Sequence, residues 1–333
     1  MSKLIRYKSI VCCDSEYSLF LYFLLTDYKI EESLFFFSQR LNIVYRNKLK
    51  RNGIYLKTYR GNNRFIAIML NVFYYFLVIL ILCIKRSIKL PTYGFDFLQF
   101  SAPIIKSSSS FYLIEDGLSN YEKPNLIQRS LKDSRIKQIL CKIGVYQPPY
   151  GVSDAVKKIY MTSLQPIPSS IIDKVECINL SQIWNFLSDS RRDEILSFFL
   201  DKVSIPRGES QCLIITQCWS EYNIMTESQK IDIYQRIVGK IKKTNRYDNI
   251  VLKTHPAETT DYKLYFDNVT IIEDPIPVQV LELLGYKFST MVTVNSTAIY
   301  SSGCNHKILL LEENVGDHEL YKYLLERLKD EIL

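Results

Sequence analysis

One residue suited to acid–base chemistry directly follows a predicted strand. The segment NIVLKTHPAE places His255 just beyond the strand expected at Ile250–Lys253, and Pro256 biases His255 away from helical geometry. An imidazole titrates near neutrality and can protonate a departing phosphate. Since the chain has three histidines, we take His255 as a candidate functional group. A loop histidine that hydrogen-bonds the backbone is the simpler alternative.

Two carboxylates follow another predicted strand, Phe111–Ile114, in the segment FYLIEDGLSNYEKP. Glu115 and Asp116 come directly after this strand, and Gly117 allows the backbone to turn sharply. Side chains at the carboxyl ends of parallel strands point toward the crevice where α/β proteins bind ligands. A carboxylate there can face an acceptor hydroxyl. An Asp-Gly turn that caps the next helix is the alternative.

Hydroxyl side chains follow a third predicted strand, Met291–Val294, in the segment MVTVNSTAIYSSG. Asn295, Ser296 and Thr297 stand where a helix of small residues is expected to begin. Hydroxyls and free backbone N–H groups at a helix N-terminus suit a phosphate. The alternative is an ordinary Ser/Thr N-cap.

A fourth segment, CLIITQCWSEYN, contains a single carboxylate in the loop Gln217–Asn223. This residue, Glu221, is a candidate base, or it is an acidic residue in the first turn of a helix.

Short β-branched runs alternate with longer amphipathic stretches along the chain. This alternation predicts parallel sheets wrapped by helices, which must position the residues named above. The polar stretch Val203–Ser210 reads as a linker between two such regions, and Glu227–Lys243 has a helical stripe of apolar residues. The expected strands are Ser9–Cys13, Ser33–Phe37, Phe111–Ile114, Ile159–Met161, Val175–Ile178, Cys212–Thr216, Ile250–Lys253, Thr270–Ile272, Met291–Val294 and Lys307–Leu311.

Composition bounds the class of protein. The 333 residues are 47% hydrophobic and 23% charged, which suffices for two cores and argues against disorder. The formal charge of +7 is spread along the chain, so it does not indicate nucleic-acid binding. The eight cysteines lack metal-site spacing and no secretory signal precedes them. We therefore expect reduced, mostly buried thiols in a cytosolic protein.

The apolar segment Phe65–Ile84 is long enough to span a bilayer of ordinary thickness. Spanning would, however, put strands of one sheet on opposite sides of a membrane. The sequence therefore favours a helix that covers the first sheet and presents its outer face to lipid head groups, with a wholly buried helix as the alternative.

Taken together, the motifs resemble those of bacterial sialyltransferases. An acidic pair with glycine, a Lys-x-His-Pro and a Ser-Thr pair stand in the same order, each after a strand, and the chain most resembles glycosyltransferase family 52. The resemblance implies an α/β fold of GT-B type with two Rossmann-like domains and a cleft between them. The expected domains are 1–203, on the acceptor side, and 204–333, which binds the donor.

The resemblance also implies roles for individual residues. His255 would stand near the CMP phosphate as general acid, and Ser296 and Thr297 would hold that phosphate. The general base stays open between Asp116, in the acidic motif, and Glu221, because family 52 has an aspartate in the loop where this chain has Glu221. The remaining expected donor-site residues are Lys253, Pro256, Asn295, Glu115 and Gly117. No metal or other cofactor is expected.

The implied reaction is inverting transfer of sialic acid from CMP-sialic acid to a terminal galactose of a capsular or lipooligosaccharide glycan, with an α2,3 linkage. Such acceptors are often lipid-linked, so a peripheral location at the inner face of the cytoplasmic membrane is expected, and a homodimer is implied. The alternatives are another GT-B transferase that uses CMP-Kdo or CDP-glycerol, a polysialyltransferase, or a non-catalytic capsule-assembly protein.

Overall fold

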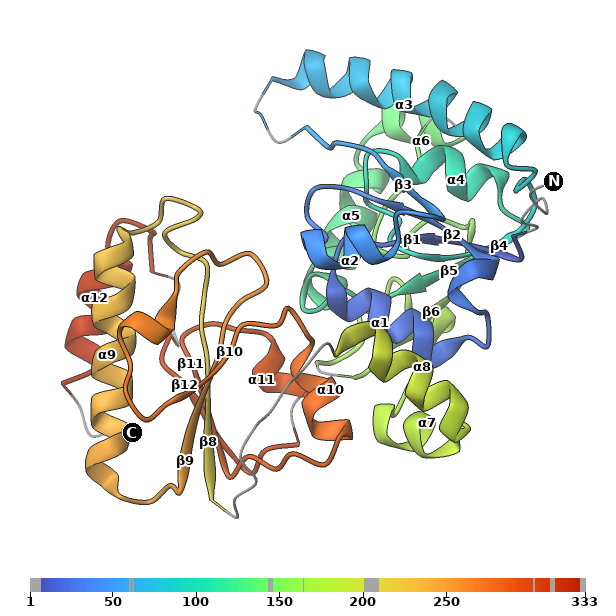
Figure 1. Ribbon diagram of the computed structural model, residues 1–333. Coiled ribbons are helices and arrows are strands. Elements are labelled where there is room, and N and C mark those ends of the chain that lie inside the picture. Colours follow the sequence, from blue (N-terminus) through green and yellow to red (C-terminus); the bar gives the residue numbers. More distant parts are fainter. Residues whose placement is uncertain are drawn as a thin grey trace. The chain divides into compact units, whose positions relative to one another are not determined.

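The chain folds into two compact units, Met1–Ile195 and Leu196–Leu333. The computed structural model describes residues 7–59, 61, 63–142, 146–163, 165–200, 210–301, 303–311 and 315–329. The predicted domain boundary between residues 203 and 204 lies outside the described residues, as does the predicted linker Val203–Ser210 apart from Ser210. Each unit contains one parallel sheet with helices on its faces, so the predicted α/β class is confirmed (Figure 1).

The sheet of the N-terminal unit has seven strands in the order β3-β2-β1-β4-β5-β6-β7, and every pairing is parallel. The strand order reverses next to β1, as in doubly wound folds. Its strands are β1 (Ser9–Cys12), β2 (Ser33–Phe37), β3 (Gly53–Tyr55), β4 (Pro91–Gly94), β5 (Ser110–Ile114), β6 (Val156–Met161) and β7 (Val175–Cys177).

Helices cover both faces of this sheet. Tyr74 and Val78 of one helix share a buried core with Ile10 and Leu34 of the sheet. On the opposite face, Tyr22 hydrogen-bonds the hydroxyls of strand residues that alternate with these. The helices are α1 (Glu16–Leu25), α2 (Ile43–Lys48), α3 (Arg64–Ile84), α4 (Ser101–Ser107), α5 (Ser119–Lys132), α6 (Arg135–Lys142), α7 (Leu180–Phe186) and α8 (Asp189–Phe199), with 3₁₀ turns at Ile30–Glu32 and Ile172–Lys174.

The C-terminal unit has a five-stranded parallel sheet in the order β10-β9-β8-β11-β12. Helices α9 and α12 cover one face, and α10 and α11 lie on the other (Figure 1). Its elements are β8 (Gln211–Ile215), α9 (Glu227–Thr244), β9 (Asn249–Lys253), a 3₁₀ turn (Tyr262–Leu264), β10 (Thr270–Ile272), α10 (Val278–Leu283), β11 (Thr290–Thr293), α11 (Ala298–Ser301), β12 (His306–Leu309) and α12 (Leu320–Arg327).

All ten predicted strands are present; nine lie within two residues of their expected ends, and β6 begins three residues before its expected start. Two strands were not predicted. The edge strand β3 has three residues, and β4 begins with Pro91 and ends with Gly94, which are residues typical of turns. A proline is accommodated there because it is the first residue of its strand. All eight cysteines are free, and five of them are buried.

Helix α3 corresponds to the ambiguous apolar segment Phe65–Ile84. Tyr74, Val78 and Leu82 are buried against the sheet, and a stripe on the other side of the helix is exposed. The stripe contains Ile66, Met69, Val72, Phe73, Phe76, Leu80 and Ile84. A search of the described residues finds no helix with both the length and the apolar character needed to cross a membrane.

The close pairing of β1 with β4 depends on Gly94. Its φ of +119° is a conformation that side-chain-bearing residues rarely adopt, and a Cβ atom would lie 1.9 Å from the carbonyl oxygen of Cys12. The Cys12 carbonyl also accepts a hydrogen bond from the Phe95 N–H, at 2.8 Å. The backbone at Gly94 therefore has no room for a side chain.

We predict that Gly94→Ala lowers the free energy of unfolding of the N-terminal unit by about 3 kcal/mol, because both the clash and the backbone strain must be relieved. Gly239→Ala is the matched control. Gly239 lies inside α9 with no atom near its missing Cβ, so alanine there should stabilise by about 0.5–1 kcal/mol. Urea unfolding followed by circular dichroism measures both. A Gly94→Ala protein as stable as the wild type contradicts this account of the β1–β4 contact.

Candidate active site

His255 lies in a tight turn directly after β9, and this turn fixes its backbone and its ring. The backbone N–H of His255 donates to Oε2 of Glu258 at 2.6 Å and to Oγ1 of Thr216 at 3.2 Å. The N–H of Ala257 donates to the ring Nδ1 at 3.1 Å. Because Nδ1 accepts this bond, the hydrogen of the neutral ring belongs on Nε2. The neutral imidazole therefore has a hydrogen-bond donor at Nε2.

The surroundings of His255 disfavour its charged form. Burial lowers the pKa of His255 to about 4, the positive charges of Lys253 and Lys230 contribute to the decrease, and Glu221 opposes it. The imidazole is therefore neutral at pH 7 in the unliganded protein. A neutral imidazole can donate a hydrogen bond from Nε2–H. An anion bound beside the ring would raise the pKa of His255.

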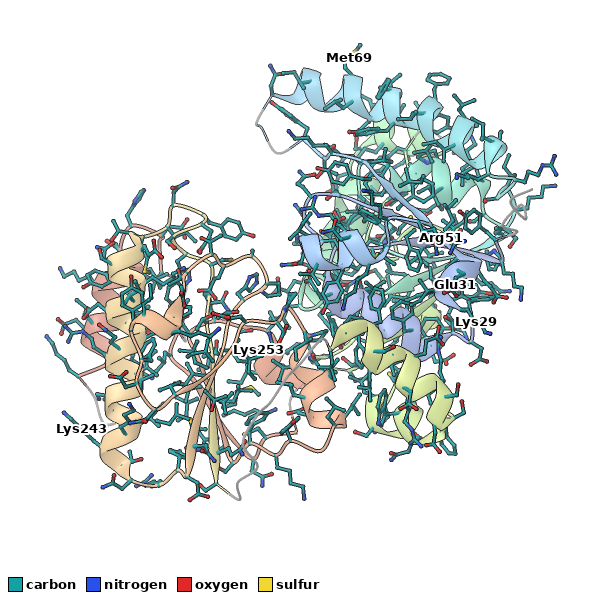
Figure 2. The ribbon with its side chains drawn as sticks, viewed as in Figure 1. Lys29, Glu31, Arg51, Met69, Lys243 and Lys253 are labelled. Atoms are coloured by element: carbon teal, nitrogen blue, oxygen red, sulfur yellow. The ribbon has the colours of Figure 1, made fainter. Side chains whose placement is uncertain are left out.

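Lys253, at the end of β9, is a buried cation (Figure 2). Its ammonium group donates to the backbone carbonyls of Thr254, at 3.2 Å, and Asp274, at 3.4 Å. Pro256 follows His255 and is half-buried. Lys253 thus adds positive charge beneath the histidine turn.

Glu221, one of the two candidate bases, is held in an ion pair. Both of its carboxylate oxygens contact Nζ of Lys230, at 3.0 and 2.9 Å, and Oε1 accepts the N–H of Thr259 at 2.8 Å. Burial disfavours the charged form, but the bonds from Thr259 and Lys230 outweigh it and lower the pKa of Glu221. An open hollow of about 560 Å³ lies beside Glu221 and is also lined by Thr226 and Gln229.

Asn295, Ser296 and Thr297 follow β11, which lies two strands away from β9 in the same sheet. Parallel strands end at one edge, so the hydroxyls and His255 share that edge, on strands about 10 Å apart, which is twice the spacing of neighbouring strands. Oγ1 of Thr293 accepts the N–H of Ser296 at 3.1 Å. Helix α11 has four residues, so its dipole is small.

Glu115, in the N-terminal unit, is completely buried. Its carboxylate accepts hydrogen bonds from the hydroxyls of Tyr17 and Tyr121, each at 2.8 Å, and from the N–H of Thr162 at 2.9 Å as well as the Thr162 hydroxyl. These four bonds tie α1, α5 and the end of β6 to the end of β5. Glu115 is therefore part of the framework at this strand end, and its predicted contact with substrate stays a prediction.

Asp116 is half-buried, and Gly117 follows it with a φ of +124°. Burial raises the pKa of Asp116 to about 7, and the neighbouring carboxylates Asp14 and Glu115 add to the increase. A hydrogen bond with Ser15 and the positive charge of Arg40 oppose it. A carboxylate with a pKa near 7 is well suited to remove a proton at neutral pH.

The structure groups the predicted residues by unit. His255, Lys253, Pro256, Glu221 and Asn295–Thr297 belong to the carboxyl edge of the C-terminal sheet, and Glu115–Gly117 belong to the N-terminal unit. Sequence reasoning missed the polar residues that surround the two central groups. Around His255 these are Thr216, Lys230, Glu258 and Tyr262, and around Asp116 they are Asp14, Ser15 and Arg40. Glu258 stands three residues after His255, and Asp14 follows the first strand, so position alone could have indicated both.

Comparison with known proteins agrees with this architecture. Residues 54–309 match glycosyltransferase family 52, and the chain belongs to this family. It is 38% identical over 226 residues to an uncharacterized protein of Haemophilus influenzae, covering 66% of this chain and 68% of that protein. The resemblance noted in the sequence is confirmed, and the protein is a glycosyltransferase.

Solved structures share its fold. The α/β-galactoside α-2,3-sialyltransferase of Photobacterium phosphoreum superposes with a TM-score of 0.56 at 11% identity, covering 97% of this chain and 96% of that one. A 2,6-sialyltransferase of Photobacterium sp. JT-ISH-224, in a ternary complex with CMP and lactose, gives a TM-score of 0.55 at 12% identity, covering 96% and 76%. The GT-B domain of a sialyltransferase from Photobacterium damselae gives a TM-score of 0.52 at 15% identity, covering 96% of each chain, so the GT-B type of the fold is confirmed.

Within the described part of the chain, no group of three or more His, Cys, Asp and Glu side chains is arranged to hold a metal ion.

Because the pKa of Asp116 is raised in the folded protein, the free energy of unfolding should depend on pH. The unfolded chain loses this proton near its ordinary value of 3.8, whereas the folded protein keeps it until about pH 7. Between these values the folded state binds more protons, so stability falls as pH rises and levels off above pH 7. Asp116→Asn removes this dependence. Its stability relative to the wild type should increase by at least about 1 kcal/mol between pH 5 and pH 8.

Urea unfolding at several pH values measures this difference, and the exposed Asp133→Asn is the control. A difference between Asp116→Asn and wild type that stays constant with pH would mean that Asp116 titrates normally.

Proposed function

We propose that the protein is a sialyltransferase that moves sialic acid from CMP-sialic acid to a terminal galactose. The observation that carries the proposal is the arrangement in the C-terminal sheet, where an imidazole with Nε2–H available shares a strand edge with the Ser296–Thr297 hydroxyls. Family 52 membership and the sialyltransferase folds support the same conclusion. We further propose that transfer inverts the anomeric configuration and uses no metal.

The proposed reaction is a single displacement. The acceptor oxygen forms a bond to the anomeric carbon of sialic acid while the bond from that carbon to the phosphate oxygen of CMP breaks. The acceptor hydroxyl proton passes to a carboxylate, and the electron pair of the broken bond leaves on CMP. The transition state resembles an oxocarbenium ion, so positive charge develops at the anomeric centre and negative charge on the departing phosphate, while the transferred proton neutralises the base.

The low pKa of His255 defines how it would assist departure. A neutral imidazole donates a hydrogen bond from Nε2 to the leaving phosphate oxygen, and the approach of that anion raises its pKa toward that of a proton donor. A phosphate monoester has a second pKa near 6, so CMP needs little more than this hydrogen bond. Ser296 and Thr297 would bind the other phosphate oxygens.

We assign the general base to Asp116 in preference to Glu221. Glu221 is tied to Lys230 and Thr259 with a lowered pKa, which makes it a poor proton acceptor. Burial instead raises the pKa of Asp116 to about 7, which favours proton capture at neutral pH.

For the acceptor we propose a galactose-terminated glycan of a capsule or lipooligosaccharide, joined through an α2,3 linkage. The lactose in the ternary complex of the Photobacterium 2,6-sialyltransferase supports a galactoside, and the enzyme from P. phosphoreum supports the linkage.

Release of CMP from a panel of donors tests the function. The wild type should release CMP from CMP-sialic acid in the presence of lactose, and should not release it from CMP-Kdo or CDP-glycerol. Preference for either of these other donors would replace the sialyl assignment, and no release from any donor would favour a non-catalytic protein.

His255→Ala should lower the turnover number for transfer by about 10²–10⁴-fold, since it removes the group that meets the leaving phosphate. His318→Ala, an exposed histidine near α12, is the matched control and should keep wild-type turnover. Transfer by His255→Ala at the wild-type rate rules out the proposed role.

We also propose that the protein works at the inner face of the cytoplasmic membrane and contacts anionic lipid through α3. Met69 projects from the outer side of this helix (Figure 2), and Phe73 and Phe76 are 58% and 69% exposed. Lys85, Arg86 and Lys89 follow the helix and are also exposed. An exposed apolar stripe with adjoining cations is the pattern of a helix that lies in the head-group region.

Vesicle sedimentation tests the membrane contact. The double variant Phe73→Ser/Phe76→Ser should bind vesicles of phosphatidylglycerol and phosphatidylethanolamine at least tenfold more weakly, because two exposed rings no longer enter the lipid. Tyr74 is left intact, since it is buried and its hydroxyl donates to the carbonyl of Lys57. Phe186→Ser, at a phenylalanine that is 82% exposed on α7, is the control. Unchanged vesicle binding combined with loss of a homodimer would assign the face to a second copy instead.

A further inference from the structure

Four hydrogen-bond donors converge on the carboxylate of Glu258, whose side chain is 1% exposed. Oε2 accepts the backbone N–H of His255, at 2.6 Å, and the hydroxyl of Thr216. Oε1 accepts the hydroxyl of Tyr262 at 2.7 Å and lies 3.4 Å from Nζ of Lys230. One oxygen therefore faces the histidine turn, and the other faces the core.

The same carboxylate closes the turn that contains His255. The backbone N–H of Glu258 donates to the carbonyl of His255 at 2.9 Å, while its side chain accepts the N–H of His255. Inside this closed turn, the N–H of Ala257 donates to Nδ1 of the imidazole. Since the ring is held by the turn and the turn by Glu258, displacement of this carboxylate would change the position of the ring.

The carboxylate is in turn anchored by a buried cation. Lys230 comes from α9, its side chain is completely buried, and it contacts both Glu258 and Glu221. Thr216, the residue after β8, also bonds the carboxylate, and its N–H donates to the carbonyl of Lys253 at the end of β9, at 3.1 Å. Thr216 therefore connects the ends of the two strands. Buried charges are retained at low cost only when they are paired and hydrogen-bonded. The group therefore has little freedom to rearrange.

We propose that Glu258 is a positioning residue, which fixes the His255 imidazole, with its hydrogen on Nε2, through the turn 255–258. Glu258 itself touches no reacting atom. The proposal rests on the function proposed for His255 where it concerns catalysis, while its structural part concerns the free protein.

Glutamine is the informative replacement because it has nearly the same size but a different set of donors. All four partners of the carboxylate are donors, whereas an amide has one acceptor oxygen and an N–H₂ group that only donates. In Glu258→Gln, either the His255–Thr216 side or the Tyr262–Lys230 side must face another donor. Lys230 loses the negative charge of Glu258 in both cases. Because this buried ammonium group can only donate, the amide oxygen is expected to face it, and the turn then loses its anchor.

A double-mutant cycle tests the catalytic part. Glu258→Gln should lower the turnover number by about 10- to 100-fold, as expected for misplacement of a reacting group, with less than a threefold change in KM for CMP-sialic acid. In the His255→Ala background the same substitution should have almost no effect, because the ring on which it acts is gone. Effects that multiply in the double variant would overturn the proposal.

Asp232→Asn is the matched control. Asp232 is also a carboxylate of this unit that accepts a tyrosine hydroxyl, from Tyr321 at 2.9 Å, and pairs with a cation, Arg236. It should keep wild-type turnover. If Glu258→Gln does not fold, Thr216→Val serves instead, since it removes the hydroxyl that contacts both His255 and Glu258, and a smaller loss with the same non-additivity is expected.

The ¹⁵N NMR spectrum of the histidine rings tests the structural part without substrate. In the wild type His255 should show a neutral ring with hydrogen on Nε2, and in Glu258→Gln a mixture of the two tautomers. His306 and His318 should be unchanged. An unaltered His255 spectrum would overturn the proposal. If the wild type transfers no sialic acid but the spectra change as expected, the proposed function fails and the positioning role stands.

Discussion

Lys230 imposes the main electrostatic constraint on the C-terminal unit. A completely buried ammonium group is costly unless carboxylates surround it, and this one is met by Glu221 from the loop after β8 and Glu258 from the turn after β9. The two loops are therefore held against α9 by these ion pairs. Because the His255 backbone is bonded to the same carboxylate, the need to neutralise a buried charge also determines where the imidazole lies.

In the N-terminal unit, two adjacent carboxylates differ in their environments. Glu115 is fully satisfied inside the protein and joins the ends of β5 and β6, while Asp116, one residue later, is half-buried beside Asp14. Burial shifts the pKa of Asp116 upward to about 7 and the pKa of His255 downward to about 4. Each environment disfavours the charged form, and this suits a base that captures a proton and an imidazole that donates a hydrogen bond.

Much of this arrangement could be predicted from the sequence. Buried parallel strands such as Ser33–Phe37 are continuous apolar runs, so their positions and the residues that follow them are visible in the chain. The strand Pro91–Gly94 is not visible in the sequence, because its residues favour turns and form a strand only through pairing with two neighbouring strands. The family motifs led to His255, Asp116 and the Ser296–Thr297 pair.

Apart from Glu258 and Asp14, whose positions near strand ends could have indicated them, the partners of these groups could not be predicted, because tertiary packing brings them from distant parts of the chain. Lys230 looks like any lysine on an amphipathic helix, and its burial follows from tertiary packing. Glu221 reads as a free carboxylate until Lys230 is placed beside it. Glu115 likewise belongs to an acidic motif, yet Tyr121 and two residues remote from that motif, Tyr17 and Thr162, take up its hydrogen-bonding capacity.

Product analysis tests the account most directly. The purified protein, incubated with CMP-sialic acid and lactose, should form a sialylated trisaccharide whose NMR spectrum shows the α anomer, the inverse of the β configuration of the donor. A product of β configuration would contradict the single displacement. Absence of any sialylated product, with lactose and with a wider panel of galactosides, would contradict sialyl transfer itself.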